Sequence, residues 1–89
     1  MNNARRKQIE NILDRVSTLL SDLDDIRTDF ENIRDEEQEA YDNLPESLQY
    51  SEKGEAMENA VNLLEEAYST VDDAFSSLED LSSNLDEIL

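Results

Sequence analysis

The sequence predicts an all-α protein: an antiparallel two-helix coiled-coil hairpin that pairs with a second copy into a dimeric four-helix bundle. Apolar residues recur at alternating steps of three and four through both halves of the 89-residue chain. The only proline and the only glycine, Pro45 and Gly54, lie near the middle and separate two halves of similar length. This arrangement is typical of a single domain, 1–89, made of two helices joined by a short elbow.

The first helix is predicted over about residues 5–43. Its apolar residues occupy heptad positions a and d: Ile9, Val16, Leu23 and Phe30 at a, and Ile12, Leu19, Ile26 and Ile33 at d. No proline or glycine interrupts this run. The pattern therefore favours one continuous helix.

An elbow is predicted at residues 44–51. Pro45 begins the segment "PESLQ", where its missing N–H costs nothing if a short helical turn starts there. Ser51 is expected to cap the next helix, because its hydroxyl can accept a hydrogen bond from a first-turn N–H. Glu52 and Glu55 would then be favourable near that positive helix end.

The second helix is predicted over about residues 52–88. Position a holds Met57, Leu64, Val71, Leu78 and Leu85, and position d holds Ala60, Ala67, Ala74, Leu81 and Ile88. Pairing residues whose numbers sum to 97 brings each a position opposite a d position and puts large side chains against small ones. In this register Phe30 faces Ala67.

Position e carries a further set of apolar side chains, which we expect on one flank of the hairpin: Leu13, Leu20, Val61, Tyr68 and Phe75. Arg27 is expected near Tyr68 on this flank, as a cation–π contact. Contiguous apolar residues in water usually mark an interface. We therefore predict a homodimer through this flank, and the alternative is a lone hairpin whose long side chains partly cover it.

The chain is strongly acidic, with 24 Asp and Glu against 7 Lys and Arg and a net charge of -17. Such a charge disfavours direct binding to nucleic acid or to anionic membranes, because both need basic side chains. No apolar run is long enough to span a membrane, and no signal-peptide core follows Met1. We expect a soluble cytoplasmic protein.

The acids of the second helix are predicted to form a ridge on its outer face. From Gly54 onward there are ten acids and no base, and nine of the acids fall at positions b and c. The candidate partner-binding residues are Glu58, Glu65, Glu66, Asp72, Asp73, Glu79 and Asp80. The ridge suggests docking to a basic protein, in the manner of a nucleic-acid mimic. The alternatives are a solvated face that keeps the protein soluble, or a structural assembly module that oligomerises through its apolar flank.

Catalysis is not expected, because the chain has neither histidine nor cysteine. The segment "DLDDIRTDFE" at 22–31 has three early acids, but Ile26 and Arg27 stand where a calcium loop needs a ligand and a glycine. Glu37 falls at position a, but a carboxylate-bridged di-iron site normally also needs histidines. We expect no metal and no cofactor.

Two segments, "DEEQEAYDNLPESLQ" at 35–49 and "SEKGEAME" at 51–58, resemble a stretch shared by short acidic helical proteins of bacteriophages and mobile elements of Gram-positive bacteria. The resemblance implies a bacterial host cell and an inhibitor of host defence or host enzymes, and it implies no site residues. A rival resemblance is to secreted helical hairpins with Trp-x-Gly in the bend. "YSTVD" at 68–72 is similar to part of their export signal, but the chain has no tryptophan.

Overall fold

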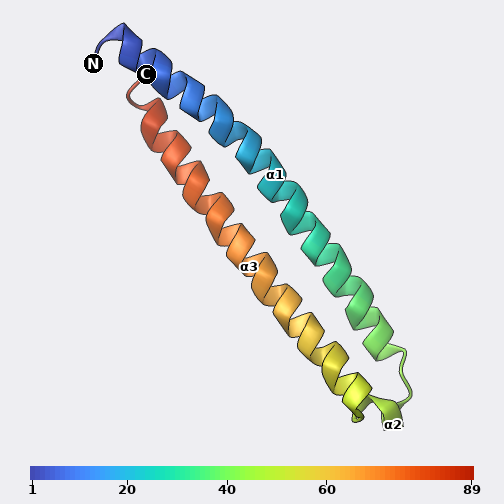
Figure 1. Ribbon diagram of the computed structural model, residues 1–89. Helices are drawn as coiled ribbons and strands as arrows, with labels where there is room; N and C mark the ends of the chain where they lie inside the picture. Colours follow the sequence, from blue (N-terminus) through green and yellow to red (C-terminus); the bar gives the residue numbers. More distant parts are fainter.

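The computed structural model describes residues 1–89 and is helical almost throughout. The chain forms α1 (Asn3–Asp42), α2 (Glu46–Gln49) and α3 (Glu52–Asp86). α1 and α3 pack side by side in opposite directions, so that both chain termini lie at one end and α2 at the other (Figure 1). The predicted all-helical hairpin is confirmed.

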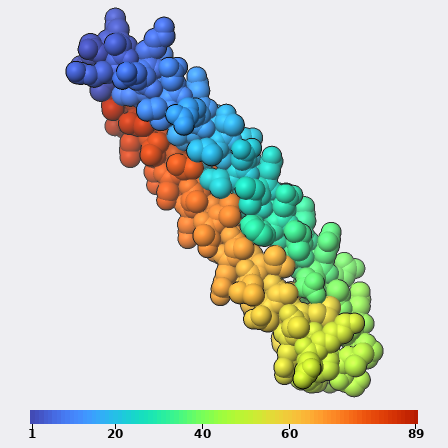
Figure 2. Space-filling view, viewed as in Figure 1, coloured from blue at the N-terminus to red at the C-terminus, as the bar shows by residue number.

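The hairpin is a thin rod, and its Cα atoms extend over 68 × 14 × 14 Å. The two long helices contact each other along this rod (Figure 2). A rod only two helices thick has little interior, and Val16 and Val61 are its only buried apolar residues. Most apolar side chains are therefore half-buried or exposed.

Both long helices begin at a side-chain cap. The side-chain oxygen of Asn2 accepts a hydrogen bond of 2.9 Å from the N–H of Arg5 at the start of α1. The hydroxyl of Ser51 accepts one of 3.4 Å from the N–H of Gly54 at the start of α3. Each cap satisfies an N–H that has no partner within the helix, and the predicted cap at Ser51 is confirmed.

The elbow is stabilised by hydrogen bonds to backbone carbonyls at the end of α1. The side-chain amide of Gln49 donates to the carbonyl oxygens of Tyr41 and Leu44, both at 3.3 Å. Pro45 is the N-cap of α2, and the N–H of Leu48 donates to its carbonyl at 2.8 Å. The Gln49 side chain therefore ties α2 to carbonyls at and just after the end of α1 and has a structural role in the elbow.

Gly54 is required because the backbone of α2 passes very close to it. A Cβ atom at this position would lie 2.1 Å from the carbonyl oxygen of Gln49 and 2.7 Å from that of Leu48. Gly54 is also one of the few buried residues of the chain. The only glycine therefore allows α2 to fold back against the first turn of α3.

The seam between α1 and α3 uses heptad positions a and e, whereas the sequence predicted a and d. Val16 at position a and Val61 at position e are 7% and 5% exposed. Position d of α1 faces solvent instead, and its four residues are 42–51% exposed: Ile12, Leu19, Ile26 and Ile33. The predicted d column of the seam is therefore wrong on α1.

Side-chain size on α3 explains this rotation. Its e column holds Val61, Tyr68 and Phe75, whereas the matching d positions are alanines. Burying the e column removes more apolar area from water than burying the alanines, and this lowers the free energy of the fold. Both helices turn their e columns inward as a result.

Two ion pairs cross the seam between α1 and α3. Arg27 pairs with Asp72 and Arg34 pairs with Glu65, and the residue numbers sum to 99 in both pairs. The predicted register has a sum of 97, so these pairs differ from it by two residues. A long arginine side chain can reach a partner two residues along the seam, so the predicted register, with Phe30 opposite Ala67, stays a prediction.

Candidate functional site

The acidic ridge on α3 has two sides with different surroundings. Its b column borders the seam, and Asp72 and Glu65 of that column form ion pairs with arginines of α1. Its c column lies one residue further around the helix and faces solvent: Glu66, Asp73, Asp80 and Glu87. The expectation of an uncompensated ridge is therefore wrong at Glu65 and Asp72, whereas the other b-column acids, Glu58, Glu79 and Asp86, form no ion pair.

Arg27 forms the stronger of the two links across the seam. Its Nη1 lies 2.6 Å from Asp72, and its Nη2 lies 2.6 Å from Asp24 on its own helix. Hydrogen bonds to Asp24 and then to Asp72 raise the pKa of Arg27 above its ordinary value. The guanidinium also stacks 4.2 Å from the centre of the Phe75 ring. The predicted cation–π partner, Tyr68, is thus replaced by Phe75.

Arg34 forms the second link. Its Nη1 lies 3.3 Å from Glu65, and its Nη2 lies 2.8 Å from Asp35. The charge of Asp35 and the hydrogen bond to Glu65 raise the pKa of Arg34. Its Nε is buried and has no hydrogen-bond partner. Each arginine thus neutralises one carboxylate on each helix.

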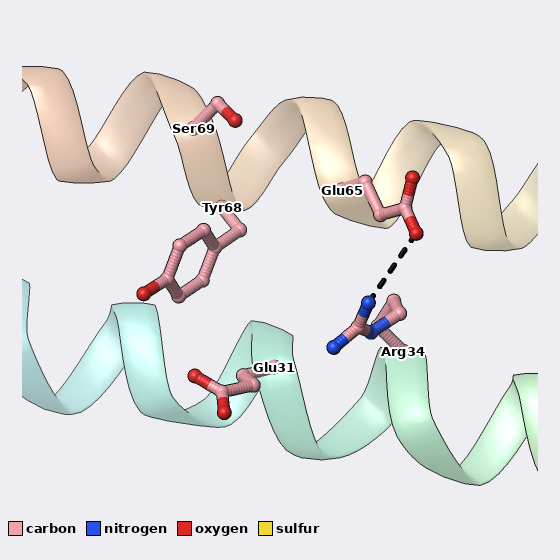
Figure 3. Close-up of a pocket in the computed structure, with 5 residues that line it drawn as sticks. All are labelled: Glu31, Arg34, Glu65, Tyr68 and Ser69. Carbon is pink, nitrogen blue, oxygen red and sulfur yellow. Dashed lines mark hydrogen bonds and ion pairs between the residues drawn. The ribbon is translucent and has the colours of Figure 1, made fainter.

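A hollow of about 300 Å³ opens between α1 and α3 beside this second link, lined by Glu31, Arg34, Glu65, Tyr68 and Ser69. Figure 3 shows the Tyr68 ring reaching from α3 toward α1, with the Arg34–Glu65 pair further along the groove. No hydrogen bond joins the Ser69 hydroxyl to Glu31 or Glu65.

Of the seven predicted partner-binding residues, Glu65 and Asp72 are the two that form ion pairs. The other five are exposed and have no basic partner within the chain: Glu58, Glu66, Asp73, Glu79 and Asp80. The unpaired part of the predicted site is therefore the c-column residues Glu66, Asp73 and Asp80 together with Glu58 and Glu79, the b-column residues on either side of the two ion pairs.

The five residues predicted for self-association lie elsewhere than expected. Val61 is buried and the other four are half-buried, all along the a/e seam: Leu13, Leu20, Tyr68 and Phe75. Their apolar surface is used within the hairpin and does not form a free flank. The sequence signal for this placement was side-chain size, because the apolar residues in the e column of α3 are larger than the alanines in its d column.

A different set of apolar side chains is exposed. We call it the d stripe, and it comprises Ile12, Leu19, Ile26 and Ile33 of α1 with Ala74, Leu81 and Ile88 at position d of the second half of the chain, Leu63 at the adjacent position g, and the half-buried Ala60 and Ala67. Its large members are 39–55% exposed. In an antiparallel pair with an a/e seam, the two d columns border the same side of the hairpin. The d stripe is therefore one continuous apolar face.

No helix of the structure combines the length and apolar character needed to cross a bilayer. No group of three or more Asp and Glu side chains is arranged to hold a metal ion. Comparisons with protein-family models, curated proteins and solved structures give no match to this chain.

Proposed function

We propose that this chain is a small non-catalytic protein-binding module that presents the outer column of the α3 ridge to a basic partner. The observation that carries the proposal is the unequal neutralisation of the ridge. Arginines of α1 hold Glu65 and Asp72, whereas Glu66, Asp73 and Asp80 have no basic neighbour. In the middle of α3, the unpaired negative charge is thus directed away from the hairpin.

A partner with a groove lined by Lys and Arg fits this face best. Proteins that bind nucleic acid have such grooves, and a rigid rod carrying regular carboxylates competes with a phosphate backbone for them. The module then acts as an inhibitor in the cytoplasm of a bacterial cell, as the family resemblance implies. Association of opposite charges is fast and weakens when salt screens them.

The test reverses three outer carboxylates together, with Glu66→Lys, Asp73→Lys and Asp80→Lys in one variant. A matched control carries the same charge change on exposed residues of α1: Asp14→Lys, Asp25→Lys and Glu39→Lys. Wild type, variant and control are immobilised and exposed to lysate of the source cell at low and at high salt. Mass spectrometry identifies the bound proteins.

We expect wild type and control to retain a basic protein at low salt and to release it at high salt, and the α3 variant to retain none. Retention of the same protein by all three would contradict the proposal. Glu65 and Asp72 are left unchanged, because reversing them also removes the ion pairs to α1.

A structural assembly module is the second candidate, and the exposed d stripe favours it. Contacts made by Ile and Leu side chains persist at high salt, because they depend on apolar burial and not on charge. A partner retained at high salt by wild type and by the α3 variant would favour this second function.

A further inference from the structure

The face that carries the d stripe is uncharged along α3 from residue 56 onward. Positions d and g of this helix hold no acid and no base between residues 56 and 88: Ala56, Ala60, Leu63, Ala67, Thr70, Ala74, Ser77, Leu81, Asn84 and Ile88. In the whole chain 35% of residues are charged. The exclusion of charge from the α3 half of this face is the composition expected at the centre of a protein interface. The α1 half is bordered by Arg15, Asp22, Asp29 and Glu36 at position g.

The same face combines large and small side chains in adjacent rows. On α1 the d column is formed by branched residues such as Leu19 and Ile26, and on α3 it includes Ala60, Ala67 and Ala74. The face therefore carries both projecting side chains and the spaces that can accept them. A face of this kind is complementary to a second copy of itself.

The exposed area is close to what a stable dimer requires. The seven large members of the d stripe are each 39–55% exposed, which together equals about three fully exposed Leu or Ile residues. These side chains present on the order of 500 Å² of apolar surface, against about 800 Å² per partner in a standard interface. The alanines and the uncharged rim along α3 supply the remainder.

The hairpin alone also has little core to stabilise it, because only Val16 and Val61 are buried apolar residues. Chains of this size with so thin a core usually depend on a further source of stability, and oligomerisation is a common one. A second hairpin stacked on the d stripe doubles the number of helices around a shared interior.

We infer that the d stripe is the interface of a homodimer, in which two hairpins stack as a four-helix bundle. This interface leaves the outer column of the α3 ridge exposed, and the inference does not rest on the function proposed for that ridge. Each copy has a net charge of -17, so electrostatic repulsion opposes pairing. Salt therefore strengthens the homodimer, whereas it weakens binding to a basic partner.

Sedimentation equilibrium of the purified full chain tests this inference, at about 0.02 and 0.5 M NaCl. Leu19→Glu places a charge in the stripe, and Ser21→Glu adds the same charge to an exposed polar position of the same helix. Ala74→Leu adds apolar surface to the stripe while filling a space between its large side chains. Circular dichroism verifies that all variants remain helical.

We expect a wild-type dimer at tens of micromolar protein that tightens at high salt. Leu19→Glu should weaken it at least about 100-fold, because the interface would bury an unpaired carboxylate. Ser21→Glu should change the dissociation constant less than about threefold. Ala74→Leu should weaken the dimer, since close packing leaves no room for the larger side chain.

A wild-type chain that stays monomeric at about 100 µM in high salt would overturn the inference. Equal dissociation constants for Leu19→Glu and Ser21→Glu would also overturn it. A tighter dimer of Ala74→Leu would show nonspecific apolar association, again against the inference. The triple ridge variant should dimerise at least as well as wild type, so failure of the ridge proposal is detected separately.

Discussion

The guanidinium of Arg27 lies 2.6 Å from the carboxylate of Asp72, across the seam between α1 and α3. The heptad pattern placed Arg27 on a free flank of the hairpin and Asp72 on an open acidic ridge. The structure brings the two residues together at the seam. Both assignments change for the same reason, which is the inward rotation of the e columns.

Replacing Arg27 with Gln should lower the melting temperature by several degrees. The change removes the pair with Asp72 and the stacking on Phe75, and it leaves two carboxylates without a counter-charge. Arg15→Gln is the control, because Arg15 is exposed and forms no ion pair. Thermal unfolding followed by circular dichroism measures both. Equal melting temperatures for the two variants would show that the Arg27 contacts contribute nothing.

Gly54→Ala should destabilise the hairpin by about 1–3 kcal/mol, because the new methyl group must displace the backbone of α2. Helix propensity alone predicts the opposite sign, a gain of about 1 kcal/mol for Ala in a helix. The free energy of unfolding of wild type and variant, measured with urea, decides between the loss and the gain. Lys53→Ala, one residue earlier, should change stability by less than about 0.5 kcal/mol. A more stable Gly54→Ala protein would rule out the close packing of the elbow.

The stability of the hairpin should fall at alkaline pH through Tyr41. Burial and then the negative charge of Glu58 raise the pKa of its phenol above the ordinary value. The folded chain therefore keeps this proton after the unfolded chain has lost it. The contribution of Tyr41 is complete below the ordinary pKa of tyrosine and is lost as pH rises through the raised pKa.

The measurement is urea unfolding at several pH values, for wild type and for Tyr41→Phe. We expect the wild type to lose stability more steeply than the variant above the ordinary tyrosine pKa. The general repulsion of a highly acidic chain affects both proteins and cancels in the comparison. Parallel pH profiles would contradict the environment described for Tyr41.

Two double charge reversals on α3 should have opposite effects on stability. Glu65→Lys with Asp72→Lys places new cations beside Arg34 and Arg27, so the melting temperature should fall. Glu66→Lys with Asp73→Lys changes the net charge by the same amount on residues without ion pairs. That variant should be at least as stable as wild type, since it reduces the overall negative charge. An equal fall in the melting temperature of the two variants would mean that the ion pairs on the b side of the ridge do not stabilise the hairpin.

Local signals were enough to predict the helices and their connection. Heptad spacing predicted helical structure on both sides of Pro45, and a hydroxyl at Ser51 predicted a helix start. These features depend on residues close together in sequence, so no knowledge of the packing partner was needed. The close approach of Gln49 to Gly54 was not predictable, because it depends on the path of α2.

The seam was harder to predict because positions a, d and e are all rich in apolar residues. Position e of α1 holds Arg27 and Arg34 besides Leu13 and Leu20, and long arginine side chains can lie along a seam and pair across it. The alanines of α3 looked suitable for close packing at d, whereas Val61, Tyr68 and Phe75 offered more apolar area at e. Choosing between the two seams needed a comparison of buried area over both helices at once.

The a/e seam is the basis of this account, and the neighbouring residues Leu19 and Leu20 test it most directly. The chain has no cysteine, so Leu19→Cys and Leu20→Cys each introduce a single thiol. Their rates of modification are compared at a protein concentration where sedimentation shows monomer, with the urea-unfolded chains as references. We predict that Cys at 19 reacts almost as fast as when unfolded, and that Cys at 20 is at least about tenfold slower. Faster modification at 20 than at 19 would restore the a/d seam and contradict the account.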